Sequence, residues 1–295
     1  MGTPEFGAII LEGLIKYKPY SGRWPNGPFR PILVVTAPDK PVGREQILTP
    51  SPVKVIAQKC DIPIEQPEKI ENLKLKIENL KPDLIVATAY GQIISKEILE
   101  IPQEGSLGVH PSLLPKYRGP TPIQAAILNG DKETGVTIIL MDEKMDHGPI
   151  LAQRKLEIVK DETASTLHDK LAELGENLLI ETISKWLRGL LKPWPQDETK
   201  AIYTKILTRE DGRIIWKKTA KELEREIRAF SGWPGSFTFW EKRGGKMVRM
   251  KILKVRVLKS MRGVSYPLGK TLVVPQNEIA VQCLSLIHIS EPTRP

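Results

Sequence analysis

Short apolar runs punctuate the first half of the chain. Residues 32–35, 83–87 and 135–140 are rich in β-branched side chains and bounded by Pro, Asp or Gly, as is typical of strands buried in a parallel sheet. Helical spacing of apolar residues separates them at 52–59 and 70–80. This alternation predicts an α/β sheet whose ligands collect at the carboxyl ends of its strands.

Polar and aromatic residues stand where these strands are expected to end. Thr36, Tyr90, His110 and Asp142 each follow, or close, an apolar run. We therefore expect a ligand site built from the loops that carry them.

A long helix and a proline-rich break follow the last of these runs. Asp161 or Thr163 is a suitable N-cap, and leucine and isoleucine then recur at helical spacing as far as Leu187. Residues 192–199 contain two prolines and several polar residues, as a linker does. We predict a first domain at 1–190, a linker at 191–202 and a second domain at 203–283.

The second domain changes in both pattern and charge. One helical stretch, 220–230, precedes an alternating basic stretch at 247–257, which predicts a small β-barrel. Residues 203–283 hold 18 lysines and arginines against 7 acidic residues, a net charge of +11, whereas residues 1–202 hold 25 against 27, a net charge of −2. Such a domain either tracks phosphates or presents a solubilising surface.

Neither end of the chain matches the expected fold. Residues 1–6 begin directly with a loop, so the opening strand of the sheet is expected to be missing. The tail 284–294 resembles the peptide encoded by a common sequencing-library adapter, and we expect 284–295 to carry no function. Its alternative interpretation is an ordinary apolar strand.

Several classes of protein are disfavoured by the sequence. No run approaches the ~18 apolar residues of a membrane span, and no signal segment opens the chain, so we expect a cytoplasmic protein without membrane contact. Cys60 and Cys283 have no metal-ligand spacing, and we expect no metal and a buried Cys60. Glycine-rich nucleotide motifs are absent as well.

One segment carries the most specific chemical signal. Residues 108–119 read GVHPSLLPKYRG and are followed by GVT at 135–137 and MDHGP at 145–149. This arrangement resembles the signature of folate-dependent formyltransferases, in which a strand-end His and an Asp before Gly form the reacting centre. The resemblance implies that His110 and Asp146 are catalytic.

Further segments narrow the resemblance to the methionyl-tRNA formyltransferases. They are GTPEF at 2–6, PDKPVGR at 38–44, YGQII at 90–94 and RAFSGWPG at 228–235. The resemblance covers nearly the whole chain to about residue 282 and implies a Rossmann-like formyltransferase domain followed by a barrel like an oligonucleotide-binding fold. It implies 10-formyltetrahydrofolate as formyl donor, initiator methionyl-tRNA as acceptor, and a monomer.

The chemistry accounts for these residue types. An amine attacks the formyl carbon, and the tetrahedral oxyanion must be stabilised before the folate leaves. His110 could donate to that oxyanion, while Asp146 orients the imidazole and helps to remove the proton that the amine loses.

Gly108 departs from the family pattern, which places Asn two residues before the His. Losing one oxyanion donor typically lowers turnover about 100- to 1000-fold. A catalytically impaired folate- or RNA-binding homologue therefore stays open. A second alternative, independent of Gly108, is a formyltransferase acting on a small amine such as a nucleotide sugar or glycinamide ribotide, and the segment at 228–235 argues against it.

The resemblance also implies binding residues. The folate is expected in the pocket near residues 87–90 and the loop 141–146, largely through backbone groups. Its expected binding residues are Ala87, Ala89, Tyr90, Ser112, Leu113, Leu114, Pro115 and Asp142. For Asp142 and His147 a structural role in the loop is favoured over chemistry. Lys40 and Arg44, in a loop marked by Pro and Gly, are expected to contact tRNA.

Overall fold

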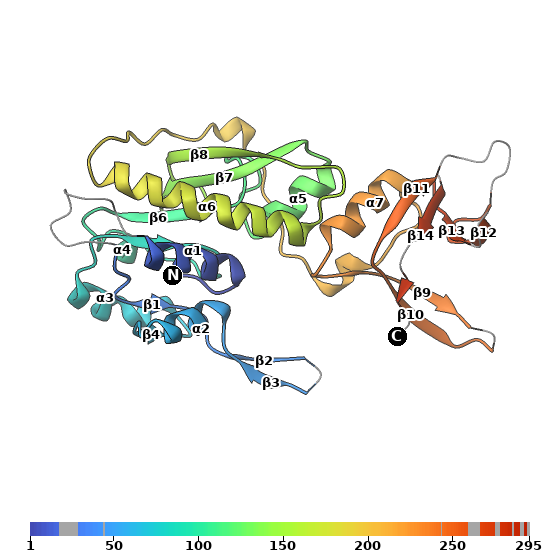
Figure 1. Cartoon of the computed structure of the whole chain (residues 1–295), viewed down its shortest axis with the longest axis horizontal. Helices are drawn as coiled ribbons and strands as arrows, with labels where there is room; N and C mark the ends of the chain where they lie inside the picture. The colour runs from blue at the N-terminus through green and yellow to red at the C-terminus, as the bar shows by residue number, and fades with distance from the viewer. Residues whose placement is uncertain are drawn as a thin grey trace. The chain divides into compact units, whose positions relative to one another are not determined.

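The structure is a computed structural model, and it describes residues 1–17, 29–43, 45–242, 244–258, 266–274, 278–284, 286–289 and 292–293. The chain forms two compact units (Figure 1). The first consists of Met1–Pro120, Thr134–Glu157 and His168–Thr204, and the second of Thr121–Glu133, Ile158–Leu167 and Lys205–Pro295. The limits of the sequence domains remain a prediction.

The first unit is built on buried strands. β1 (Val34–Val35) pairs in parallel with β4 (Ile64–Glu65). A separate sheet has the order β5-β6-β7-β8, with β5 (Ile85–Ala87), β6 (Ser106–His110), β7 (Glu133–Leu140) and β8 (Ile150–Glu157). A hairpin of β2 (Lys40–Val42) and β3 (Ile47–Thr49) extends from this unit.

Helices accompany the strands where the apolar spacing predicts them. α2 (Pro52–Lys59) starts at Ser51, whose side chain accepts a hydrogen bond from the backbone N–H of Lys54 at 3.1 Å. The predicted helix at 70–80 begins as the 3₁₀ turn η1 (Ile70–Leu73) and continues as α3 (Lys74–Leu80). α6 (Ala164–Trp186) is the predicted long helix, and Thr163 caps it by accepting from the N–H of Thr166 at 3.2 Å. The remaining helices of this unit are α1 (Glu5–Lys16), α4 (Lys96–Leu99) and the 3₁₀ turn η2 (Glu198–Lys200).

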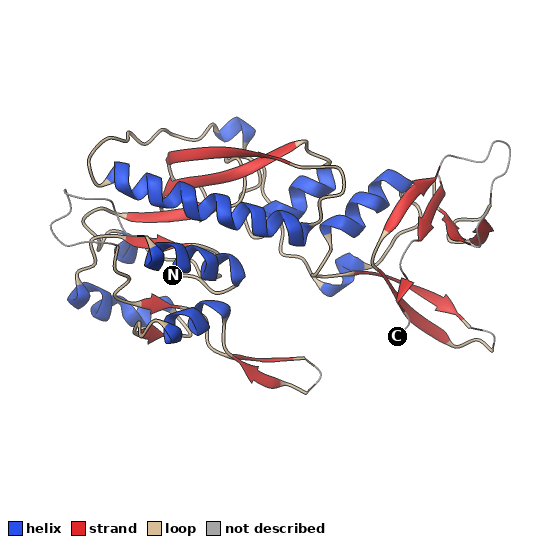
Figure 2. Cartoon of the chain, in the orientation of Figure 1, coloured by secondary structure: helices blue, strands red, loops and turns tan. Residues whose placement is uncertain are grey.

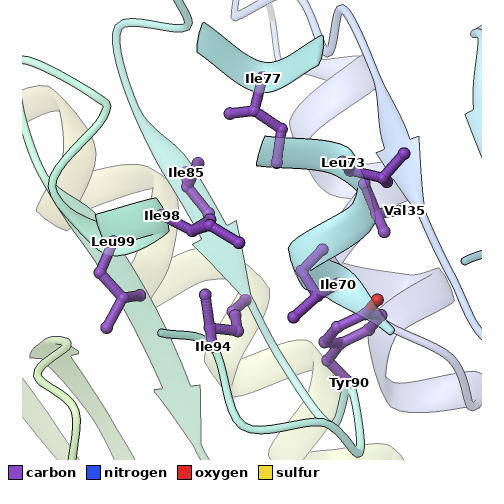
Figure 3. Packing of buried hydrophobic residues seen from close by; sticks show 10 residues of the cluster. Val35, Ile70, Leu73, Ile77, Ile85, Tyr90, Ile94, Ile98 and Leu99 are labelled. Atoms are coloured by element: carbon purple, nitrogen blue, oxygen red, sulfur yellow. The ribbon is translucent and has the colours of Figure 1, made fainter. Parts of the chain in front are cut away.

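Apolar side chains from η1, α3 and the strands form one core cluster of this unit (Figure 3). Val35 of β1 and Ile85 of β5 contribute from separate strands, and Ile98 from α4 is completely buried. At about 25 cal/mol per Å² of apolar surface removed from water, this burial holds the helices on the strands that carry the site loops.

The predicted direction of one strand is wrong. β7 is buried as expected, but it runs antiparallel to β6, with Leu107 opposite Leu140 and His110 opposite Thr137. A continuous apolar run indicates that a strand is buried on both faces, but it does not indicate whether the strand runs parallel or antiparallel to its neighbour. The chain between the two strands returns to the end of the sheet where it left β6, so β7 must run back along it.

The second unit contains short helices among several strands (Figure 2). One sheet has the order β15-β10-β9, with β9 (Ser236–Glu241), β10 (Met247–Ile252) and β15 (Pro292–Thr293). The other has the order β11-β14-β13-β12, with β11 (Val255–Leu258), β12 (Thr271–Val274), β13 (Glu278–Gln282) and β14 (Leu286–Ile289). Helical elements of this unit are α5 (Pro122–Asn129), the 3₁₀ turn η3 (Arg209–Gly212) and α7 (Ala220–Ala229).

Helix α7 organises the core of the second unit. Thr219 and Glu222 form a capping box at its start, and Leu223 and Ile227 pack with Ile252 of β10 and Val281 of β13. An α/β unit followed by a smaller β-rich unit confirms the predicted fold class.

The alternating stretch at 247–257 forms strands as expected, β10 and β11. Two other local expectations, for Cys60 and for the tail, need adjustment. Cys60 is exposed rather than buried, because it ends α2 beyond the face that buries Val53 and Ala57. The tail takes part in the sheets, since β14 pairs with β11 and β13, while the adapter origin of its sequence stays a prediction.

Within the described ranges, no helix is long and apolar enough to cross a membrane.

Candidate active site

The carboxyl ends of β5 and β6 bring two loops to one edge of the sheet. The strands are parallel and Ala87 lies opposite Gly108, so the residues after Ala87 lie beside His110. A third loop joins them, because the Thr3 hydroxyl donates to the Tyr90 carbonyl and accepts from the N–H of Ala37, each at 3.3 Å.

His110 and Asp146 meet at this edge. Nδ1 of His110 lies 3.5 Å from Oδ2 of Asp146, and the imidazole is buried whereas the carboxylate is partly exposed. On the other side of the ring, Nε2 donates to the carbonyl oxygen of Tyr117 at 2.9 Å. The structure thus brings the two predicted catalytic residues together and fixes the ring between a carbonyl and a carboxylate.

The backbone around this pair is strained. Asp146 has a φ of 50° and Tyr117 a φ of 65°, and Ala89 in the neighbouring loop has a φ of 44°. Non-glycine residues are uncommon in this left-handed region, and such positions concentrate where a site over-determines the backbone. The N–H of Gly119 donates to Oδ2 of Asp146 at 2.7 Å and helps to hold the carboxylate.

A buried arginine ties the site loop to the segment that precedes the second unit. Arg118 is completely buried, and its guanidinium donates to both Gln196 and Glu198. The hydrogen bond with Glu198 raises the pKa of Arg118 and lowers that of Glu198. Gln196 in turn donates to the carbonyl oxygen of Asp146 at 2.8 Å.

Sequence reasoning missed this network. Residues 191–202 were expected to be a linker, yet Trp194 exchanges two backbone hydrogen bonds with Ile150, and Ile202 accepts one from Arg118. Fully buried arginines are rare, so the sequence offered little reason to expect Arg118 in the interior. An arginine inside the motif and polar residues after two prolines were the features that pointed to this network.

The predicted folate-binding residues at 87–90 lie at this edge but differ in burial and in the direction of their side chains. Ala87 ends β5 and is buried, whereas Ala89 is exposed. The Tyr90 side chain points into the core cluster (Figure 3), and burial, reinforced by Glu71, raises the pKa of its hydroxyl to about 12. The Tyr90 hydroxyl is buried and has no hydrogen-bond partner among the described residues.

The loop at 112–115 is held by polar side chains from neighbouring strands. Thr137 donates to the Ser112 carbonyl at 2.6 Å and accepts from the N–H of Leu114 at 3.1 Å. Gln153 donates to the Leu114 carbonyl at 3.0 Å. These bonds hold the loop in place, and Leu113 and Pro115 are partly exposed along it.

Asp142 and His147 form a second imidazole–carboxylate pair. Nδ1 of His147 lies 2.5 Å from Oδ2 of Asp142, and Nε2 lies 3.5 Å from Oε1 of Glu198. The Asp142 side chain also accepts from the N–H of Lys144 at 3.0 Å. Both carboxylate oxygens of Asp142 thus have partners inside its loop, which favours a structural role and leaves its predicted folate contact to the backbone.

Gly108 lies in the middle of β6 with little space beside it. A Cβ at this position would lie 3.0 Å from Cγ1 of Ile139 and 3.2 Å from Cγ of Met141. Apolar side chains therefore fill the place where the family pattern expects an asparagine.

Two residues were predicted to contact tRNA. Of these, Lys40 is exposed on β2, and Arg44 lies outside the described residues. The hairpin also exposes Val42, Ile47 and Leu48. In the described part of the chain, no group of three or more His, Cys, Asp and Glu side chains is arranged to hold a metal ion.

Comparison with known proteins extends over both units. Residues 24–183 match the formyl transferase family, and residues 206–290 match the formyl transferase C-terminal domain. The chain is 41% identical over 260 residues to a methionyl-tRNA formyltransferase of Roseiflexus sp. (strain RS-1), covering 88% of this chain and 76% of that protein. It is 38% identical over 281 residues to a methionyl-tRNA formyltransferase of Staphylococcus aureus (strain JH1), covering 94% of this chain and 86% of that protein.

Solved structures share the fold at lower identity. An N-formyltransferase from Helicobacter canadensis, in complex with folinic acid and dTDP-3-aminofucose, matches with a TM-score of 0.67 at 20% identity, covering 98% of this chain and 96% of that chain. At this identity the likeness shows the fold alone.

Proposed function

Because the chain belongs to the family of methionyl-tRNA formyltransferases, we propose that it transfers the formyl group of 10-formyltetrahydrofolate to the amino group of methionyl initiator tRNA. The observation that carries the proposal is the His110–Asp146 pair, held at 3.5 Å at the edge where the β5 and β6 loops meet. We further propose that the protein acts as a monomer in the cytoplasm.

The reaction needs one proton acceptor and one oxyanion partner. The amine lone pair attacks the formyl carbon, and the carbonyl oxygen becomes an oxyanion. The amine nitrogen then loses a proton, the bond from the formyl carbon to N10 of the folate breaks, and N10 takes up a proton. Tetrahydrofolate and the N-formyl amine are the products.

The geometry of the His110–Asp146 pair suits the removal of a proton from the amine. Nε2 carries its hydrogen toward the Tyr117 carbonyl, so in a neutral ring Nδ1 and the Asp146 carboxylate are two acceptors facing each other. A proton held between them satisfies both. Asp146 can thus take the proton from the amine, and Nδ1 shares it.

Stabilising the oxyanion needs one exchange of partners. For His110 to donate to the oxyanion, the ring must release one of two partners. Either Nε2–H leaves the Tyr117 carbonyl, or Nδ1, once it carries the proton taken from the amine, turns that proton from Asp146 to the oxyanion. Hydrogen bonds of free active sites commonly tighten or exchange when substrate binds.

The folate is proposed to lie along the loops at 87–90 and 112–115. Thr137 and Gln153 fix the second loop from β7 and β8, so its free backbone edge is preorganised. A pterin presents donors and acceptors along one edge, and fixed backbone groups are suited to reading them.

The second unit is proposed to bind the tRNA. On the β9–β10 ribbon, Arg249 lies over the ring of Phe237 at 3.7 Å, and Arg213, which follows η3, lies over the ring of Phe239 at 5.5 Å. Phe239 and Trp240 are exposed. Cationic side chains interleaved with aromatic rings suit a phosphate backbone and its bases. Lys40 and Arg44 are proposed to reach the acceptor end.

One observation keeps a second function in view. Ile139 and Met141 occupy the space beside Gly108, so no carboxamide from this position assists the oxyanion. A homologue that binds folate and tRNA but transfers formyl slowly has the same fold and the same basic unit.

A formylation assay separates these possibilities. Purified protein is mixed with 10-formyltetrahydrofolate carrying a labelled formyl group and with methionyl initiator tRNA, and label in the aminoacyl fraction is measured. Methionyl elongator tRNA and a dTDP-amino sugar are the matched alternative acceptors. Transfer to the initiator alone supports the proposal, transfer to the sugar contradicts it, and tRNA binding without transfer supports the impaired homologue.

A further inference from the structure

The side-chain amide of Gln196 reaches the loop that carries Asp146. Its Nε2 donates to the carbonyl oxygens of Asp146 and Gly148, each at 2.8 Å. Its Oε1 accepts from Nε and Nη2 of the completely buried Arg118, at 3.1 and 2.9 Å. An arginine can only donate and a carbonyl can only accept, so these four hydrogen bonds allow the amide one orientation.

The backbone that Gln196 holds is in an unfavourable conformation. Asp146 has a φ of 50°, and a non-glycine residue keeps such a conformation only where its surroundings over-determine it. Two residues further on, a Cβ on Gly148 would collide with the carbonyl oxygen of Leu140. The close approach to β7 fixes the loop at Gly148, whereas Gln196 fixes the backbone of Asp146 itself.

The segment that carries Gln196 is anchored on both sides of it. Before it, Trp194 exchanges two backbone hydrogen bonds with Ile150, at 2.8 and 3.0 Å. After it, the carbonyl of Ile202 accepts from the N–H of Arg118 at 2.8 Å. These residues all belong to the first unit, so Gln196 extends from a fixed part of that unit.

The two partners of the His110 ring lie on the two loops that Gln196 joins. The Tyr117 carbonyl, which accepts from Nε2 of the ring, directly precedes Arg118 in the chain. Asp146, which faces Nδ1 at 3.5 Å, has its own carbonyl held by Gln196. The contact between Arg118 and Gln196 therefore connects the loop on one side of the imidazole with the loop on the other.

We propose that Gln196 is a positioning residue for formyl transfer, which holds Asp146 in its left-handed conformation and so keeps the carboxylate on His110. The inference rests on the proposed function, because it assigns Gln196 a role through Asp146 rather than on the reacting atoms. A displacement of about 1 Å in a catalytic group can lower a rate about 100-fold. A residue outside the reacting centre can therefore have a large effect on the rate.

Two substitutions separate the two sides of the Gln196 amide. Gln196→Glu keeps an oxygen for Arg118 but turns a second oxygen, in place of the N–H donors, toward the carbonyls of Asp146 and Gly148. Gln196→Leu removes both sides. Each variant is expected to lower the single-turnover rate of formyl transfer by at least about 10-fold while changing folate affinity by less than about 3-fold.

Hydrogen exchange of the Gly119 amide gives a second measurement that needs no formyl transfer. This amide donates to Oδ2 of Asp146, so its exchange reports whether the carboxylate stays in place. Exchange is expected to be at least about 10-fold faster in both variants. The amide of Ile85, which donates to Gly105 in the sheet, is the internal control. If the unmodified chain transfers no formyl group, the proposed function fails, and the Gly119 exchange still decides the role of Gln196.

Asp197→Ala is the matched control in the same segment. Asp197 accepts from the N–H of Thr199 at 3.1 Å and pairs with Lys200 at 2.9 Å, so its loss loosens η2 without removing a bond to Asp146. This variant should keep the transfer rate and the Gly119 exchange within about 2-fold of the unmodified chain.

Two results would overturn the proposal. One is a Gln196→Glu variant that keeps both the transfer rate and the protection of Gly119, since Gln196 would then serve only to pair with Arg118. The other is an equal loss in Asp197→Ala, which would trace the effect to the stability of the segment.

Discussion

Oδ2 of Asp146 lies 3.5 Å from Nδ1 of His110 and at the same time accepts a 2.7 Å hydrogen bond from Gly119. The carboxylate is therefore aligned on the imidazole by the backbone of the motif itself. A positioned carboxylate next to a buried imidazole is the arrangement from which general acid–base catalysis operates.

His110→Ala and Asp146→Asn are each expected to lower the single-turnover rate of formyl transfer by about 100-fold or more. In the proposed mechanism the two residues share one proton, so the double variant should be no more than a few-fold slower than the worse single variant. Rapid-quench transfer rates, with folate affinity measured separately, check this. The affinity should change much less than the rate, and additive losses would show that the two residues act separately.

Arg118→Leu is expected to destabilise the protein by about 2 to 4 kcal/mol, because it leaves Gln196 and Glu198 without their buried partner. The matched control is Arg154→Leu, which removes a partly exposed arginine that pairs with Glu181. This change should cost about 1 kcal/mol or less. Urea unfolding of both variants gives the comparison, and equal losses would contradict a special role for the buried arginine.

The α-amino group of Met1 predicts a pH dependence of stability. Its pKa is about 5 in the folded chain, against 8.0 as the ordinary value. Between these values the unfolded chain binds more protons, so this group makes stability rise as the pH increases from 5 to 8. Acetylating Met1 should flatten the rise in this window. Unfolding free energies of acetylated and free chains at pH 6 and pH 8 measure it, and identical slopes would mean that the amine is solvated.

Arg249→Gln is expected to weaken tRNA binding and to reduce the salt-dependence slope of log Kd by about 1, as for one lost phosphate contact. Lys59→Gln is the matched control, since Lys59 is equally exposed but ends α2 in the first unit. Binding titrations between about 50 and 200 mM salt give both slopes. Equal slopes for the two variants would argue against the β9–β10 ribbon as a contact surface.

Sequence patterns located the pair His110–Asp146 and most helices, because a motif and a periodicity are local properties. They did not reveal the direction of β7, since burial on both faces looks alike in parallel and antiparallel strands. The buried Arg118 was missed for a related reason. Its partners Gln196 and Glu198 are brought to it only by the folded path of the chain.

Gly108 is the position where the sequence and the structure together give the sharpest expectation. The family pattern places a carboxamide here, and one oxyanion donor is typically worth about 100- to 1000-fold in turnover. The structure qualifies that gain, because an added Cβ would lie 3.0 Å from Ile139 and 3.2 Å from Met141. Gly108→Asn alone is therefore expected to accelerate transfer less than Gly108→Asn combined with Met141→Ala, which makes room.

Gly108→Ala combined with Met141→Ala is the control, since it has the same backbone atoms and space but no donor. If the Asn double variant exceeds this control by about 10-fold or more in single-turnover transfer, the chain lacks a donor that the carboxamide supplies. If the two variants are equal while the unmodified chain transfers formyl rapidly, another group already stabilises the oxyanion. His110, with its Nε2 turned from the Tyr117 carbonyl, is then the group whose orientation must change during the reaction.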